Sequence, residues 1–159
     1  MISRFYRWVC VIMLFTVQLC AAKSPSEPQF ENYATKVEVI DKNAEVRITG
    51  KMERMFVTRL RYAAKQKPNF AGHYILTAWG CGALCLAPVA IDAKTGVVVW
   101  LHFSVCCWPD DVDKPLEFKL NSNLLIVRGS RNEDGEGTYY YLLKDQEFLL
   151  LKAEEKPSE

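Results

Sequence analysis

Short segments of alternating apolar and polar residues, separated by tight turns, recur from residue 73 almost to the end of the chain. This pattern restricts the possible folds more than any other feature, because period-two alternation is typical of half-buried β-strands. Turn-forming residues separate the segments at 93–96, 121–123 and 144–146. The spacing predicts an antiparallel β-meander of about six to eight short strands. We expect strands at residues 73–78, 88–92, 97–105, 116–120, 124–129, 138–143 and 147–151.

A segment with helical period precedes these strands. Thr49 or Gly50 is the expected N-cap, and Pro68 ends the helix. The apolar residues at helical spacing are Met52, Met55, Phe56, Leu60 and Ala63. Residues 37–48 are expected to form a short strand or hairpin. The sequence thus predicts an α+β fold, in which one N-terminal amphipathic helix packs on an antiparallel meander.

The N-terminus has the charge pattern of a secretory signal peptide. Arg4 and Arg7 precede an apolar run over residues 9–19, and the small residues Ala21 and Ala22 follow it. This run is shorter than the roughly twenty residues that a membrane-spanning helix needs. We therefore expect residues 1–22 to be removed, leaving an exported protein, periplasmic or extracellular, with no permanent membrane anchor. Lipidation at Cys20 is the alternative.

Composition divides the rest of the chain into three parts. Residues 23–36 form a polar, proline-containing linker, residues 37–152 a single globular domain, and residues 153–159 a charged tail that we expect to be frayed. Without the signal segment, eighteen basic residues stand against nineteen acidic ones. Because the net charge is near −1, the chain lacks the basic surplus typical of nucleic-acid-binding proteins, and we expect no nucleic-acid partner. The oligomeric state stays open.

Four cysteines remain after residue 22, namely Cys81, Cys85, Cys106 and Cys107. An even number of cysteines in an exported domain is typical of disulfides, and four allow three pairings. Adjacent cysteines rarely bridge each other, because the small ring strains the peptide bond between them. We therefore expect two disulfides that join the 81–85 loop to the 106–107 pair and staple the fold.

Three motifs surround these cysteines. They are Pro-Asn-Phe-Ala-Gly-His-Tyr at 68–74, Trp-Gly-Cys-Gly at 79–82 with Cys85, and Asp-x-x-Thr-Gly at 92–96. Together they resemble a family of small exported bacterial proteins of unknown function. The resemblance covers roughly residues 52–151. It implies a location in the bacterial envelope and adds no mechanism.

The leading functional hypothesis is a non-enzymatic module that binds an envelope protein or ligand, with no cofactor. An inhibitor or immunity protein would be one such case. Aromatic residues and arginine are enriched in recognition hot spots. On this basis the candidate binding residues are Trp79, Trp108, His73 and Arg131.

Two other hypotheses invoke chemistry. One is a copper or zinc site, or a thiol-redox site, built from Cys81, Cys85 and His73. The other is a hydrolase that relies on His73 and the acidic cluster Asp110, Asp111 and Asp113. The sequence contains no Gly-x-Ser-x-Gly and no His-Glu-x-x-His motif, which disfavours the hydrolase.

Overall fold

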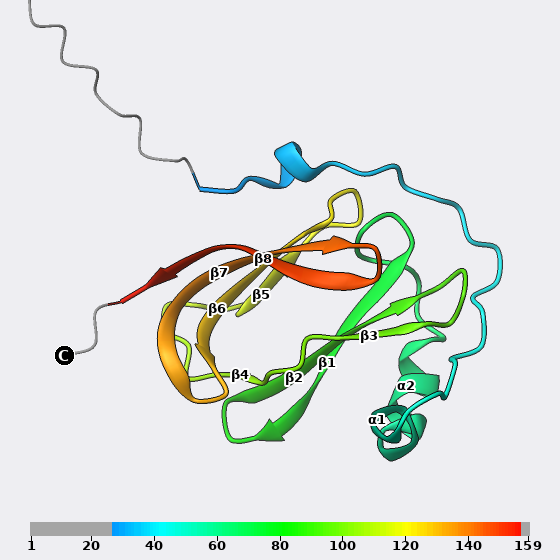
Figure 1. The fold of residues 1–159 in the computed structure, drawn as a ribbon, viewed down its shortest axis with the longest axis horizontal. Helices are drawn as coiled ribbons and strands as arrows, with labels where there is room; N and C mark the ends of the chain where they lie inside the picture. Colours follow the sequence, from blue (N-terminus) through cyan, green and yellow to red (C-terminus); the bar gives the residue numbers. More distant parts are fainter. Residues whose placement is uncertain (1–26, 157–159) are drawn as a thin grey trace, which may run out of the picture.

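The computed structural model describes residues 27–156. The expected signal peptide at 1–22, the start of the linker and the last three residues lie outside this range. Figure 1 shows a bent β-sheet with helices on one side and a long N-terminal segment running around it. In chain order the elements are η1 (Phe30–Tyr33), α1 (Lys51–Met55), α2 (Val57–Ala63), β1 (Tyr74–Gly82), β2 (Cys85–Asp92), β3 (Val98–Trp100), β4 (Val105–Cys106), β5 (Leu116–Phe118), β6 (Leu124–Arg131), β7 (Asp134–Lys144) and β8 (Glu147–Glu155).

The described strands form one eight-stranded sheet in which every pairing is antiparallel, which confirms the expected β-rich class. The order along the sheet is β1-β2-β4-β6-β7-β8. β3 pairs β2 beside β4, and β5 pairs β6. The β1–β2 hairpin and the three consecutive strands β6–β7–β8 therefore meet through the short strand β4. No helix in the described range is long and apolar enough to cross a membrane.

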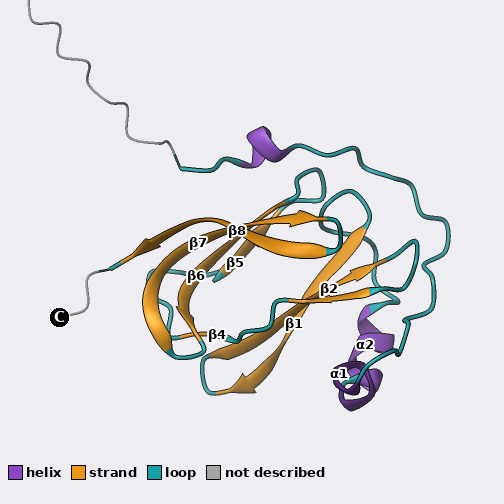
Figure 2. Cartoon of the chain, in the orientation of Figure 1, coloured by secondary structure: helices purple, strands orange, loops and turns teal. Residues whose placement is uncertain are grey.

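The main core lies on the concave side of the sheet, and Figure 2 shows strands β6 and β7 curving around it. Side chains from every strand contribute to it, with Phe148 of β8 among the partly buried ones, because period-two alternation sends every second residue inward. The buried members include Phe70, Leu76, Val99, Val105, Leu125, Val127, Tyr139 and Tyr141.

The single helix expected between Gly50 and Pro68 is not formed. The chain leaves helical geometry at Phe56, where φ is −108° and ψ is 17°, so that two short helices result. The Phe56 ring packs against both Trp79 and Trp100, with centroid distances of 5.1 and 5.8 Å, and the two tryptophan rings also contact each other. Tilted ring contacts with the tryptophans of β1 and β3 thus accompany the break. Behind it, α2 packs Leu60 and its neighbouring alanines on the outer face of β1 and β2.

Residues 37–48 form neither the expected strand nor a hairpin. They run as an extended strap along the edge of the domain, visible in cyan in Figure 1. Isolated backbone hydrogen bonds hold the strap, from the amides of Glu38, Ala44 and Arg47 to carbonyl groups of Gly72, Ala93 and Gly96. These carbonyl groups lie in two turns, one before β1 and one between β2 and β3, rather than along one strand, which explains why no ladder forms.

Part of the polar linker is ordered against the sheet. The 3-10 helix η1 places Phe30 and Tyr33 on a second outer patch made by Leu124, Ile126 and Tyr140. At the other end of the chain, β8 continues to Glu155 by pairing with β7 from Gly137 onward. The prediction of a frayed tail from residue 153 was therefore wrong for residues 153–155, because backbone pairing extends past the apolar residues.

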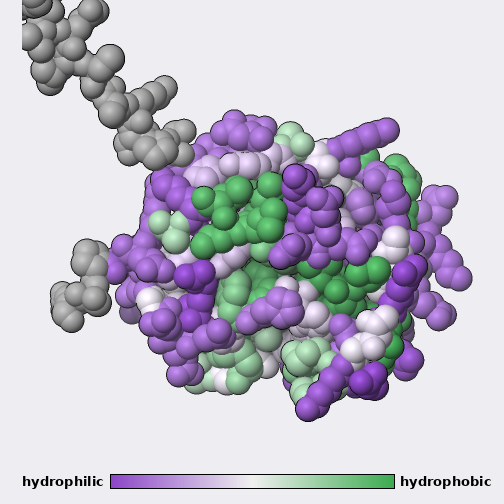
Figure 3. All heavy atoms as spheres, in the orientation of Figure 1, coloured by the Kyte–Doolittle hydropathy of each residue, from purple (hydrophilic) through white to green (hydrophobic). Residues whose placement is uncertain are grey.

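Strand β8 also exposes apolar side chains. Leu149, Leu150 and Leu151 are each about two-fifths to one-half exposed. Figure 3 shows hydrophobic side chains gathered over the β7–β8 part of the face drawn. The last strand of the sheet is thus only partly covered.

Candidate functional site

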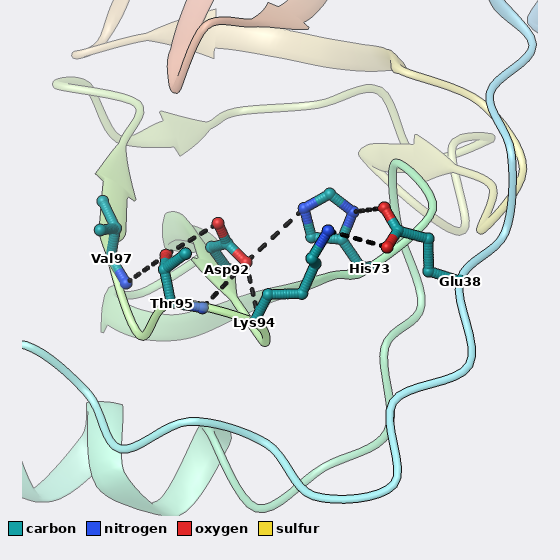
Figure 4. Close-up of polar contacts among 6 residues, drawn as sticks. All are labelled: Glu38, His73, Asp92, Lys94, Thr95 and Val97. Carbon is teal, nitrogen blue, oxygen red and sulfur yellow. Dashed lines mark hydrogen bonds and ion pairs between the residues drawn. The ribbon is translucent and has the colours of Figure 1, made fainter.

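His73 is the centre of a polar network that joins the strap to the sheet (Figure 4). Its Nδ1 lies 3.2 Å from Glu38 Oε1, and its Nε2 lies 3.6 Å from Asp92 Oδ1. Lys94 completes the network by placing its Nζ 2.8 Å from Glu38 Oε2. The imidazole side chain is one-fifth exposed, so it faces carboxylates on both sides with little contact with solvent.

The Asp-x-x-Thr-Gly motif is held together by hydrogen bonds to the carboxylate of Asp92. This carboxylate accepts hydrogen bonds from the backbone amides of Lys94 and Thr95, at 2.8 and 3.3 Å, and from Thr95 Oγ1 at 2.8 Å. Such bonds from an aspartate to the residues two and three positions later stabilise a tight turn. Burial and the nearby Asp92 charge raise the pKa of Tyr74, beside His73, to about 12. The motif closes the β2–β3 turn.

The contacts of this network differ from those of the hydrolase hypothesis. The Thr95 hydroxyl donates to Asp92 rather than to the imidazole of His73. Asp110, Asp111 and Asp113 lie in the loop after β4 and share no described contact with His73. The contacts support a structural role for His73, which joins Glu38 of the strap to the β2–β3 turn.

The cysteines pair differently from the expected pattern. A disulfide joins Cys81 to Cys85, with Cα atoms 5.2 Å apart, across the tip of the β1–β2 hairpin. Cys106 and Cys107 are free thiols. The expected two bridges between the 81–85 loop and the 106–107 pair were therefore wrong. The β1–β2 hairpin turn brings Cys81 and Cys85 together, only four positions apart in the sequence.

The copper or zinc site of Cys81, Cys85 and His73 is not assembled either. Both sulfur atoms are used in the disulfide. His73 immediately precedes β1, whereas Cys81 lies near its far end. Eight extended residues span roughly 26 Å. A strand that separates the two groups in this way excludes a shared metal ion.

The four candidate binding residues occupy separate surroundings. Trp108 packs against the main core, and Arg131 stacks over the Tyr139 ring at 3.9 Å and bonds the Tyr141 hydroxyl. His73 belongs to the network above. Trp79 lies beside a surface groove next to α2, and Arg131 lines a different hollow beside β3 and β8. The four candidates therefore line no common groove within residues 27–156.

A surface that the sequence reasoning did not consider lies on the helices. We call it the basic aromatic face and define it by α1, α2, the residues up to Lys67, and Trp79. Between residues 51 and 67 the chain has six basic residues and one acidic residue, Glu53. Glu53 is buried, and it accepts hydrogen bonds from the Trp100 indole and the Gly50 amide at 2.9 and 2.7 Å. These bonds lower its pKa.

The six cations of this face are all exposed, and none forms a salt bridge with a carboxylate of residues 27–156. Arg59 instead lies over the Trp79 ring, 5.7 Å from its centroid. The six are Lys51, Arg54, Arg59, Arg61, Lys65 and Lys67.

Large apolar side chains share the face with the cations. Tyr62 is 72 % exposed, Met55 62 % and Met52 46 %. A groove of about 450 Å³ runs between α2 and β1, lined by Arg59, Tyr62, Gln66 and Trp79 among others. A second groove, of about 430 Å³, lies on the other side of α2 between the strap and Arg61 and Lys65. The helix α2 thus stands between two hollows.

Sequence reasoning assigned Met52 and Met55 to the buried side of a continuous helix. In the structure both methionines reach the surface, and the buried side is formed instead by Glu53, Leu60 and Ala63. The charge run over residues 51–67 was the available signal, and the near-neutral charge of the whole chain concealed it.

Comparison with protein-family models, curated proteins and solved structures found no match to this chain.

Proposed function

We propose that this protein is an exported, non-enzymatic binding module that uses the basic aromatic face to hold a protein segment rich in acidic and apolar side chains. Export rests on the charge and apolar pattern of residues 1–22. An inhibitor or immunity protein that covers an acidic surface of an envelope enzyme is one form of this function.

The observation that carries the proposal is the separation of charge. The face holds six cations that form no salt bridge within residues 27–156, around one buried acid, whereas the rest of this range has seventeen acidic and eleven basic residues. Oppositely charged surfaces speed encounter and select among partners. A partner with carboxylates would supply the missing counter-charges.

Exposed apolar groups support a protein segment over a simple anion. Tyr62 and the two methionines add apolar area that an inorganic anion would leave in water. Methionine adapts to varied partner shapes, and tyrosine and arginine are enriched in binding hot spots. The two grooves that flank α2 are each large enough to receive side chains of an extended segment.

The test measures binding of a synthetic peptide that alternates glutamate with leucine and tryptophan. A matched peptide with glutamine in place of glutamate is the control ligand. We expect the acidic peptide to bind the protein, by fluorescence anisotropy, and binding to weaken as salt is raised. Replacement of Arg59 and Arg61 by glutamate should weaken binding about tenfold or more.

A matched double variant separates the face from total charge. Lys114→Glu with Lys144→Glu makes the same charge change at exposed positions on another part of the molecule. We expect it to bind as the parent does. Equal loss in both double variants, or preferential binding to anionic lipid vesicles over the peptide, would contradict the proposed partner. Tyr62→Ser tests the apolar contribution.

A further inference from the structure

All four cysteines of residues 27–156 meet where the β1–β2 hairpin tip joins β4. Cys81 and Cys85 are bonded at the tip. Cys85 is directly opposite Cys106 in the β2–β4 pairing. Cys107 follows with its Sγ 2.8 Å from the Cys106 Sγ. Two oxidised and two reduced sulfur atoms thus occupy one junction.

The strand register sets the separation of Cys85 and Cys106. Directly opposed residues of an antiparallel pair have Cα atoms about 4.5 or 5.5 Å apart, and their side chains leave the sheet on the same face. Disulfides form at Cα separations of about 4.4 to 6.8 Å. A Cys85–Cys106 bridge therefore fits the backbone as it stands.

Two backbone features hold this junction close. Gly129 of β6, at φ +124°, lies against the chain at Cys106, and a Cβ there would fall 2.5 Å from the Cys106 carbonyl oxygen. Cys107 has φ +54°, an uncommon value for a residue with a side chain, and turns the chain sharply after β4. The turn accompanies the close contact between the adjacent sulfur atoms.

We propose that these cysteines form one thiol–disulfide exchange site, in which the bridge moves between Cys81–Cys85 and Cys85–Cys106. The Cys106 thiolate attacks Cys85 Sγ, the Cys81–Cys85 bond breaks, and Cys81 leaves as a thiolate. The Cys81 thiolate then takes up one proton, which balances the proton that the Cys106 thiol lost. One disulfide and two thiols exist before and after, so no oxidant is consumed.

Exchange changes which parts of the fold are joined. In the first state the bridge closes the hairpin tip on itself, and in the second it ties β2 to β4 and frees Cys81 at the exposed tip. Cys107 is exposed in the structure as described. The second state therefore presents two exposed thiols, at Cys81 and Cys107, to an external disulfide.

The site has a definite pH dependence. The contact with Cys107, followed by burial, raises the pKa of the Cys106 thiol. Glu133 also faces this thiol, and the neighbouring strands contribute the uncharged Cys85 and Ser130. Because the thiolate is the attacking species, exchange is slow near neutral pH and faster as pH rises.

Disulfide mapping of the purified protein, prepared without reductant, tests the proposal. Samples held at neutral and at mildly alkaline pH are quenched with acid, alkylated and digested for mass spectrometry. We expect a Cys81–Cys85 peptide in both, and a Cys85–Cys106 peptide with alkylated Cys81 that forms faster at alkaline pH. Cys106→Ser should abolish the second species and retain the first.

A second variant tests the geometry without the competing bridge. Cys81→Ser leaves three thiols within residues 27–156, and a small-molecule disulfide such as oxidised glutathione should convert the variant to Cys85–Cys106 with Cys107 free. Circular dichroism establishes that the variant is folded. Absence of the Cys85–Cys106 linkage from the parent at alkaline pH overturns the proposal, whether or not the variant folds. A native protein with four free thiols overturns it as well.

Discussion

Glu53 shows how one residue joins the helices to the sheet. Its carboxylate is buried at the start of α1, where it bonds the Gly50 amide and so satisfies one free donor of the helix end. The same group accepts from the Trp100 indole of β3. A single acidic side chain therefore caps α1 and orients one of the tryptophans that surround Phe56.

The lowered pKa of Glu53 leads to a prediction for stability. Its hydrogen bonds hold the folded-state pKa below the ordinary value of 4.5. The stabilisation is therefore complete above pH 4.5 and is lost as the pH falls through the lower folded-state pKa. Glu53→Gln should lower the free energy of unfolding by about 1 to 2 kcal/mol near neutral pH.

Urea unfolding at two pH values measures this effect. The difference between the parent and Glu53→Gln should shrink when the pH is brought below 4.5. Glu147→Gln, at an exposed position of β8, is the control and should leave stability nearly unchanged. If the difference in free energy of unfolding between the parent and Glu53→Gln grew below pH 4.5, a lowered pKa of Glu53 would be contradicted.

At the scale of elements, irregular segments cover faces that the helices leave open. The η1 segment closes the outer side of β6 and β7 with Phe30 and Tyr33. Ser122, only 1 % exposed, anchors it, because its Oγ lies 2.9 Å from the Phe30 carbonyl oxygen and 3.2 Å from that of Tyr33. A buried hydroxyl in the β5–β6 turn thus decides where the arm lies.

Removal of that hydroxyl should release the arm. Ser122→Ala leaves two carbonyl groups without this donor, and we expect a loss of about 1 to 2 kcal/mol in the free energy of unfolding. Limited proteolysis should show faster cleavage near residues 27–36. The matched change Thr58→Ala on exposed α2 should leave the cleavage rate as in the parent. Unchanged cleavage in Ser122→Ala would show that the aromatic contacts suffice.

For the whole molecule, stability comes from packing on both faces of the bent sheet. One core fills its concave side, and two smaller clusters lie under the helices and under η1. The Cys81–Cys85 bridge spans only four positions of sequence at one hairpin. Short loops gain little from closure, because the unfolded chain already brings their ends together often.

The double variant Cys81→Ser, Cys85→Ser should therefore remain folded. We expect it to lose about 2 kcal/mol in the free energy of unfolding, near the lower end for disulfides. Chemical denaturation measures the loss, and circular dichroism checks that the sheet content is retained. Complete unfolding would mean that the bridge supports more of the sheet than its own hairpin.

The strands were predictable to within a few residues because their signals are local. Asp92 and Thr95 form the β2–β3 turn from bonds within one motif. Strand ends were less predictable, since β7 begins at Asp134 and β8 reaches Glu155, where backbone pairing continues through polar residues. The expected strand at 97–105 divides into β3 and β4, with His102 at φ +28° between them.

The candidate site depended on contacts that no local pattern encodes. The composition of residues 51–67 is basic, but the exposure of Tyr62 and Met55 depends on which side of the helices packs on the sheet, with Leu60 and Phe56 turned toward it. Similarly, the cysteine count predicted disulfides, and only the register of β2 with β4 decided that Cys85 faces Cys106.

The sequence by itself determined that this chain forms an antiparallel sheet with turns at defined places, because alternation and turn chemistry act over a few residues. Tertiary structure alone decided how the sheet bends, which cysteines bond and which charges are left unpaired. These properties depend on residues that lie far apart in the chain and meet only when the core is packed.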